Sequence, residues 1–169
     1  MTDNPFHKLP HKDLISTARY TPDEIRAVFA TAAELKARRD VHTGVLRNKR
    51  LAMIFEKDSL RTRFTFDIGI QDLGGSAVFM DHRDARIGSR ENVCDVAKNL
   101  ERWADIIVLR TFKHRVITEM AACCDIPVIN GLSDFLHPCQ ALADFFTLTE
   151  LWGDVRGKRV CFVGDGNNT

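Results

Sequence analysis

Residues 50–80 read RLAMIFEKDSLRTRFTFDIGIQDLGGSAVFM, and this stretch decides the fold class. Its first part, RLAMIF at residues 50–55, is a short apolar run typical of a buried strand. A helical pattern follows over about residues 59–73 and stops at Gly74-Gly75, which favours a helix C-cap. The next apolar run, SAVFM at residues 76–80, predicts a second strand. A strand, a helix and a strand in this order are typical of a parallel βαβ unit.

The same alternation continues on both sides of this unit. Upstream, Thr21-Pro22-Asp23-Glu24 combines an N-cap, a first-turn proline and a capping-box glutamate, which together predict the start of a helix. Downstream, the pattern predicts helices at about residues 93–103, 116–124 and 138–152, and strands at 105–109, 127–130 and 159–163. The expected fold class is α/β, a three-layer sandwich with a central parallel sheet flanked by helices.

The end of the chain departs from this pattern. The last predicted strand, residues 159–163, runs into Gly164-Asp165-Gly166 without a helix after it. Because such a strand would expose an unsupported edge, we expect the chain to be the first part of a longer protein. The expected division is one domain over residues 1–150. Residues 151–169 would then be the end of an interdomain helix and the first strand of a truncated second α/β domain.

The composition is that of an ordinary globular protein, with 169 residues of which 44% are hydrophobic and 28% charged. Lys and Arg total 24 against 23 Asp and Glu, and a net charge of +1 gives no reason to expect a nucleic-acid or membrane partner. No apolar run approaches the roughly 20 residues of a membrane helix. The opening residues, MTDNPFHKLPHKD, lack the apolar stretch of a signal peptide, so a cytoplasmic location is expected.

The five cysteines stand at positions 94, 123, 124, 139 and 161. Their number is odd and no pair has CxxC spacing, so the sequence predicts neither a disulfide framework nor a zinc site. Cys123 and Cys124 are expected on a helix as small hydrophobic residues. Neither a metal ion nor a cofactor is predicted.

A helix start that suits an anion follows the first predicted strand. There, free backbone N–H groups and the helix dipole favour negative charge. Ser59 and Thr62 add hydroxyl groups, and the planar guanidinium of Arg61 matches phosphate. The alternative for this segment alone is a well-capped helix start with solvated arginines.

Further polar side chains follow other predicted strands, and in parallel sheets ligands bind beyond the carboxyl ends of the strands. Arg110 comes after the apolar run DIIVL, where a bare charge is costly unless it faces a partner or a ligand. His137 begins a helix, and Gln140 lies on the same side about one turn later. These residues would share one edge of the sheet with Arg61, which favours an anion-binding site over the surface alternative.

Four motifs together resemble the aspartate/ornithine carbamoyltransferase family. They are FEKDSLRTR, the single arginine after DIIVL, NGLSDFLHPCQALAD and FVGDGNN, and the resemblance runs from about Asp13 to Thr169. The FEK start and HPCQ are similar to the ornithine branch of the family. The resemblance implies the carbamoyl-phosphate domain of such an enzyme.

The resemblance also implies a role for each matching residue. Arg110 and His137 match residues that act on the reacting carbamoyl group. Arg86 stands on a loop, about residues 84–91, that reaches the neighbouring site in the family's trimers. Carried over in full, the carbamoyl-phosphate ligands are Ser59, Leu60, Arg61, Thr62, Arg86, Arg110, His137 and Gln140, and the ornithine-binding residue is Asn168.

The activity implied is transfer of the carbamoyl group of carbamoyl phosphate to the side-chain amine of ornithine, giving citrulline and phosphate, a step of arginine biosynthesis. The full-length protein is expected to be a homotrimer. Three positions depart from the usual motif: Leu60 replaces a threonine, Asp58 a common proline and Arg86 a glutamine. The family's acceptor-specifying segments lie beyond Thr169, so the fragment alone is not expected to catalyse the transfer efficiently.

Three alternatives stay open. SLRTR and HPCQ are also similar to N-acetylornithine carbamoyltransferases, so another amine acceptor is possible. A non-catalytic module that binds carbamoyl phosphate or phosphate would need the same donor residues. A dinucleotide-binding unit, suggested by FVGDGNN, is disfavoured because the third glycine of that fingerprint would fall at Thr169.

Overall fold

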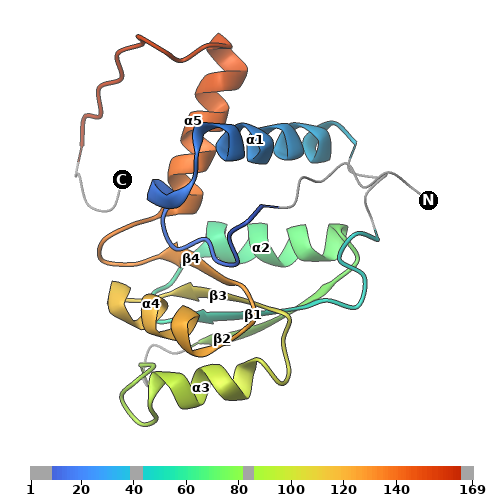
Figure 1. Cartoon of the computed structure of the whole chain (residues 1–169), viewed down its shortest axis with the longest axis vertical. Coiled ribbons are helices and arrows are strands. Elements are labelled where there is room, and N and C mark those ends of the chain that lie inside the picture. Colours follow the sequence, from blue (N-terminus) through green and yellow to red (C-terminus); the bar gives the residue numbers. More distant parts are fainter. Residues whose placement is uncertain (1–8, 39–43, 82–85, 165–169) are drawn as a thin grey trace.

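The computed structural model describes residues 9–38, 44–81 and 86–164, and its centre is a four-stranded parallel sheet (Figure 1). The strands are β1 (Arg50–Phe55), β2 (Ser76–Asp81), β3 (Ile106–Arg110) and β4 (Val128–Leu132), in the spatial order β2-β1-β3-β4. The predicted parallel sheet is therefore confirmed.

The helices of the described residues are α1 (Pro22–Ala37), α2 (Leu60–Asp72), α3 (Val93–Leu100), α4 (His114–Cys123) and α5 (Pro138–Trp152), with a 3₁₀ turn η1 (Thr17–Arg19). Their starts follow local sequence signals. The predicted capping box precedes α1, since the Thr21 hydroxyl accepts from Glu24 N and the Glu24 carboxylate accepts from Thr21 N. In these ranges no helix combines the length and apolarity needed to cross a bilayer.

The sheet has a hydrophobic core on each face, because successive strand residues point to opposite sides. Met53 of β1 packs in one core with Ile70 of α2. Its neighbour Ile54 packs in the other core with Ala97 of α3 and Ile117 of α4. Figure 1 shows α2 on one side of the sheet and α3 with α4 on the other. The predicted three-layer sandwich is confirmed.

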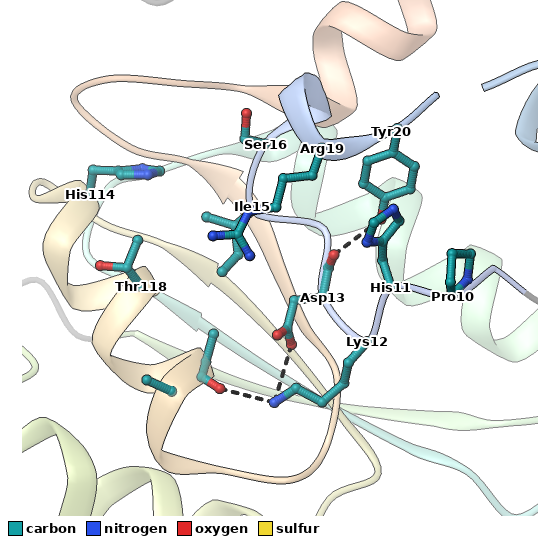
Figure 2. A pocket seen from close by; sticks show the side chains of 12 residues that line it. Pro10, His11, Lys12, Asp13, Ile15, Ser16, Arg19, Tyr20, His114 and Thr118 are labelled. Atoms are coloured by element: carbon teal, nitrogen blue, oxygen red, sulfur yellow. Dashed lines mark hydrogen bonds and ion pairs between the residues drawn. The ribbon is translucent and has the colours of Figure 1, made fainter. Parts of the chain in front are cut away.

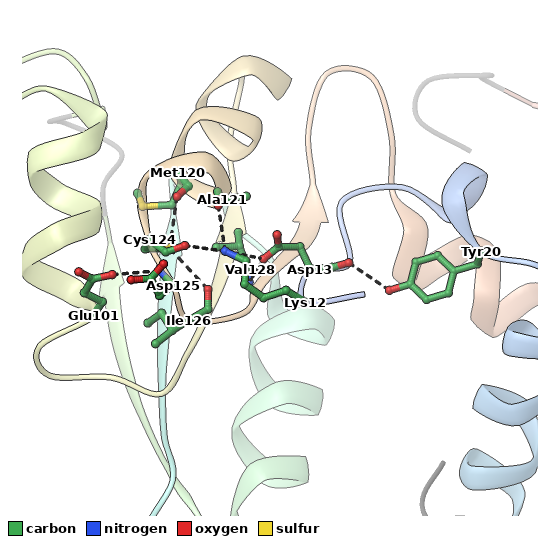
Figure 3. A network of polar contacts seen from close by, with 10 residues as sticks. All are labelled: Lys12, Asp13, Tyr20, Glu101, Met120, Ala121, Cys124, Asp125, Ile126 and Val128. Carbon is green, nitrogen blue, oxygen red and sulfur yellow. Dashed lines mark hydrogen bonds and ion pairs between the residues drawn. The ribbon is translucent and has the colours of Figure 1, made fainter. Parts of the chain in front are cut away.

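The segment before η1 covers the outer edge of β4 (Figure 3). The Asp13 carboxylate accepts from Val128 N at 2.8 Å. Lys12 Nζ donates to Ala121 O at 2.9 Å and to Cys124 O at 2.5 Å, at the C-terminal end of α4. A cation there satisfies carbonyls that the helix leaves free and opposes the helix dipole. The edge strand is thus shielded by chain from the opposite end of the sequence.

Residues 159–163 do not form the predicted strand. They are extended but pair with no other strand, and Val160, Phe162 and Val163 are exposed. A strand needs a neighbour to receive its backbone N–H and C=O groups, and none lies beside this segment in the described residues. The strand prediction is therefore wrong here, although the alternating order of the preceding elements is confirmed.

Cys94 and Cys123 form a disulfide, so the expectations that the cysteines would form no disulfide and that Cys123 would be a plain hydrophobic residue are wrong. Their Cα atoms lie 5.1 Å apart, because α3 packs directly on α4. Cys124, the next residue, is a free and buried thiol as expected, but it lies just past the end of α4 and not within the helix. The pairing arises from helix packing between residues 29 apart in the chain, so no spacing motif reveals it.

Gly75 lies in the turn from α2 to β2, and it provides a test of how tightly this turn packs against Ile70 and Lys49. A Cβ at this position would lie 2.8 Å from Lys49 O and 2.8 Å from Ile70 Cγ1. We expect Gly75→Ala to lower the free energy of unfolding by about 1–3 kcal/mol, because a backbone carbonyl cannot easily move away. Gly69→Ala, inside α2 with nothing within 4 Å, should instead raise it by about 0.5–1 kcal/mol. Denaturant unfolding followed by circular dichroism measures both, and equal effects would contradict the packing described.

Candidate active site

β1 and β3 are the two central strands of the sheet. After β1 the chain continues to β2 on one side, and after β3 it continues to β4 on the other. From this central pair, β2 lies outward beside β1 and β4 outward beside β3. The backbone N–H of Glu56, directly after β1, donates to Arg110 O at the end of β3, at 2.8 Å. In open parallel sheets ligands bind outside the carboxyl ends at such a switch point. The side chains that follow these strands are therefore the first candidates for a site.

The first turn of α2 supplies one wall of this site. Ser59 is its N-cap, and the Ser59 hydroxyl oxygen accepts from Thr62 N at 3.2 Å. That bond leaves the Ser59 hydroxyl hydrogen available to a ligand. A Cβ built on Gly131 of β4 would lie 3.7 Å from Thr62 Cγ2, so the turn passes close beside β4. The same Cβ would lie 3.1 Å from Val108 Cγ1 and 3.2 Å from Leu109 O, so it is the packing against β3 that disfavours a side chain at Gly131.

Arg110, the last residue of β3, is half-buried and incompletely paired. Its Nη1 lies 3.5 Å from Gly131 O, and its Nε is buried without a hydrogen-bond partner. Burial lowers the pKa of the Arg110 guanidinium, and the positive charge of Arg61 lowers it further. The two guanidinium groups are therefore close enough to repel each other.

The repulsion between Arg61 and Arg110 has no counterweight in the described part of the chain. No carboxylate there forms an ion pair with either guanidinium. Two adjacent cations beside a helix N-terminus form an environment that a bound anion stabilises. The same ranges hold no group of three or more His, Cys, Asp or Glu side chains suited to a metal ion.

His137 adds a neutral hydrogen-bonding group next to these cations. It precedes α5 at the N-cap position, yet its side chain makes no capping bond, and its Nδ1 is buried without a partner. Burial lowers the pKa of the imidazole, and the charge of Arg110 lowers it further, against a smaller raising effect of Asp144. At neutral pH the ring is uncharged and can donate one hydrogen bond from one nitrogen.

Gln140, one turn into α5, is exposed and oriented by a second side chain. Its Nε2 donates to Asp144 Oδ1 at 2.9 Å. This bond assigns the amide nitrogen to Asp144 and leaves the amide oxygen as an acceptor. The first turn of α5 therefore presents a hydrogen-bond acceptor.

The remaining predicted residues lie elsewhere or take a lesser part. Leu60 begins α2 with a side chain that is 72% exposed, so only its backbone N–H faces the site at the helix start. The Arg86 guanidinium lies 4.2 Å from the centre of the Phe112 ring, two residues after Arg110. Asn168 lies outside the described residues.

The sequence analysis missed Glu56, which is only 3% exposed directly after β1. Its carboxylate accepts from Ile87 N at 3.1 Å and from Phe112 N at 2.8 Å. Ile87, on the loop at about residues 84–91, is itself buried. The available signal was an acidic residue directly after an apolar strand, where an unpaired carboxylate would be costly.

A second hollow, of about 540 Å³, lies between residues 10–20 and α4 (Figure 2). Arg19 and His114 line it, but none of the predicted site residues does. Several of its ionisable side chains already have partners, as His11 pairs with Glu24 and Lys12 with Asp13. The strand-end cluster, whose cations are unpaired, is therefore the stronger candidate.

Comparison with known proteins places these observations in a family. The aspartate/ornithine carbamoyltransferase, carbamoyl-P binding domain family matches residues 12–150. Ornithine carbamoyltransferase of Bacillus subtilis is 46% identical over 157 residues, which cover 93% of this chain and 49% of the relative. That of Deinococcus radiodurans is 48% identical over 161 residues, covering 95% and 52% respectively. The chain thus spans about half the length of these curated relatives.

Solved structures agree with this result. Ornithine carbamoyltransferase from Thermus thermophilus matches with a TM-score of 0.87 and 47% identity, covering 95% of this chain and 55% of that one. The enzyme from Pyrococcus furiosus matches with a TM-score of 0.87 and 41% identity, covering 93% and 51%. These matches extend over almost the whole of this chain.

The proximity of Arg110 to His137 is testable without any ligand. Arg110→Met removes a positive charge and should raise the pKa of His137 toward its ordinary value of about 6.5, as measured by NMR titration of the ring. Arg63→Met is the matched control, since the Arg63 guanidinium lies over the Phe79 ring, 3.8 Å from its centre. A His137 pKa that responds to neither change, or equally to both, would contradict the arrangement.

Proposed function

The chain belongs to the aspartate/ornithine carbamoyltransferase family, and from that membership we propose that it is the donor-binding half of an ornithine carbamoyltransferase. The full-length protein would transfer the carbamoyl group of carbamoyl phosphate to the side-chain amine of ornithine, yielding citrulline and phosphate. The observation that carries the proposal is the unpaired Arg61–Arg110 couple beside the uncharged, partner-free His137. This set of groups suits a donor with a doubly charged phosphate and a polar carbonyl.

The phosphate of the donor would bind at the start of α2. Backbone N–H groups of the first turn, including that of Leu60, would point to the phosphate oxygens. The hydroxyls of Ser59 and Thr62 would donate further hydrogen bonds, and Arg61 would supply charge and a planar pair of donors. One charge-assisted hydrogen bond contributes roughly 1.5–3 kcal/mol, so several in one place suffice to hold a small phosphate ester.

The carbamoyl group would lie between Arg110, His137 and Gln140. The uncharged amine of the acceptor attacks the carbonyl carbon and forms a C–N bond, and negative charge develops on the carbonyl oxygen. N–H donors of Arg110 and His137 stabilise that oxygen, while the Gln140 oxygen accepts from the carbamoyl NH₂ group. The C–O bond to phosphate then breaks, and the amine proton is passed to the departing phosphate.

The acceptor would bind to the part of the protein that follows α5. We assign residues 1–150 to the carbamoyl-phosphate domain and residues 151–169, with Asn168, to the start of an acceptor-binding domain. The exposed apolar side chains of Val160, Phe162 and Val163 support this assignment, because a further domain would cover them. The chain covers only about half the length of its curated relatives, which leaves room for such a domain.

A homotrimer is supported by the surface around β2. This edge strand exposes Val78 and Met80, and the nearby Trp103 is 65% exposed. Apolar side chains on an unpaired edge favour burial against another chain. Arg86 lines the same surface, so a neighbouring subunit packed there would receive Arg86 at its own donor site. Cytoplasmic arginine biosynthesis is the setting that we propose for the enzyme.

Arg61 tests the donor site directly. In the full-length protein, Arg61→Ala should weaken the binding of carbamoyl phosphate by at least roughly 10- to 100-fold, because a charge-assisted contact to the phosphate is lost. Isothermal titration calorimetry measures the affinity. Arg63→Ala, two residues along the same helix, removes a guanidinium that stacks on Phe79 and should leave the affinity nearly unchanged. An unchanged affinity in Arg61→Ala would refute the site.

His137 tests the catalytic step. His137→Ala should lower kcat by about 10²–10³, because a donor to the developing oxyanion is removed. The dissociation constant for carbamoyl phosphate should change much less, since the ground-state carbonyl carries little charge. Steady-state kinetics combined with calorimetry separates the two quantities. Equal losses in turnover and affinity would contradict the proposed role.

A further inference from the structure

Glu56 is a buried carboxylate with both oxygens bound to backbone. It follows β1 directly and is 3% exposed. Oε1 accepts from Ile87 N at 3.1 Å, and Oε2 accepts from Phe112 N at 2.8 Å. A buried charge is costly unless its hydrogen bonds are satisfied, and here both oxygens have a donor.

The two donors belong to separate loops at the edge of the sheet that holds the candidate site. Ile87 lies between β2 and α3, and its side chain is buried in the core that includes Ile54. Phe112 lies two residues after Arg110, between β3 and α4. The Glu56 side chain therefore joins the loop after β2 to the chain after β3, while its own backbone N–H is bound to Arg110 O. Three carboxyl-end segments meet at this one residue.

These contacts also fix the position of Arg86. Arg86 is adjacent to Ile87, and its guanidinium lies 4.2 Å from the centre of the Phe112 ring. Lys57, adjacent to Glu56, places its Nζ 4.8 Å from the centre of the same ring. Cations over an aromatic face are attracted by the ring, and more strongly where water is excluded. Glu56 thus binds the backbone of Ile87, the neighbour of Arg86, and the backbone of Phe112, whose ring contacts the Arg86 guanidinium.

We propose that Glu56 is a positioning residue, which holds the loop after β2 so that Arg86 is preset for the phosphate of carbamoyl phosphate. This inference rests on the proposed function, in which Arg86 contributes to the donor site of a neighbouring subunit. A loop held in place before the donor arrives does not have to be ordered on binding, which favours affinity. Glu56 acts through Arg86 and touches neither the donor nor the acceptor.

The test is a double-mutant cycle in the full-length protein. Glu56→Gln keeps the size of the side chain but presents an NH₂ group to one of the two backbone N–H donors. Alone, it should raise the dissociation constant for carbamoyl phosphate roughly 10-fold, by loss of one hydrogen bond to a charged group. In an Arg86→Ala background the same change should have an effect below about two-fold, because coupled residues are not additive.

Two controls separate positioning from general stability and from the proposed function. Gly75→Ala, which also destabilises the fold, should leave the dissociation constant unchanged. Hydrogen exchange should show lost protection of the one amide, Ile87 or Phe112, that faces the NH₂ group in Glu56→Gln, and this result does not require carbamoyl phosphate. If the wild-type protein bound no carbamoyl phosphate, the proposed function would fail while the exchange data would still decide whether Glu56 holds the loop.

Two results would overturn the inference. One is an effect of Glu56→Gln on donor affinity that is equally large with and without Arg86, which would show that Glu56 does not act through that residue. The other is unchanged donor affinity together with lowered thermal stability, which would reduce Glu56 to a purely structural role.

Discussion

The candidate site depends on two cations that the fold brings to the same edge of the sheet, Arg61 at the start of α2 and Arg110 at the end of β3. The fold holds these two guanidinium groups close together, and in the described chain neither has a carboxylate partner. Arg110 cannot withdraw, because it ends a buried strand between β1 and β4. Arg61 is held by a helix whose start is capped by Ser59. Burial, with a smaller contribution from the charge of Arg61, lowers the pKa of the Arg110 guanidinium, and a bound anion would favour its charged form.

The surroundings of this pair divide the chemistry among different kinds of group. Positive charge is concentrated at the start of α2 and at the end of β3, where a phosphate would lie. His137, beside Arg110, is kept neutral by burial and by that same charge, so it offers a hydrogen bond without adding to the repulsion. Glu56 supplies a buried negative charge. Its two oxygens accept hydrogen bonds from the backbone N–H groups of Ile87 and Phe112, and within residues 9–38, 44–81 and 86–164 it forms no ion pair with Arg61 or Arg110.

Much of the fold follows from short-range signals in the sequence. The strands over residues 50–130 and the helix cap at Thr21 are confirmed, because apolar periodicity and capping are decided within a few residues. The strand predicted at residues 159–163 fails, since strand pairing requires a partner that apolar composition does not supply. The disulfide between Cys94 and Cys123 could not be predicted from the sequence for a similar reason, because it depends on how α3 packs against α4.

The sequence by itself determined the α/β class, the order of its elements and the set of polar residues that end the strands. Only the tertiary structure decided which of those residues meet. It brought Arg61 near Arg110, placed the Arg86 guanidinium over the Phe112 ring and buried Glu56 between two loops. The physical reason is that strand order and helix packing create neighbours across long stretches of chain. Apolar periodicity predicts which face of a helix or strand a residue lies on, but it does not predict which residues of other elements pack against that face.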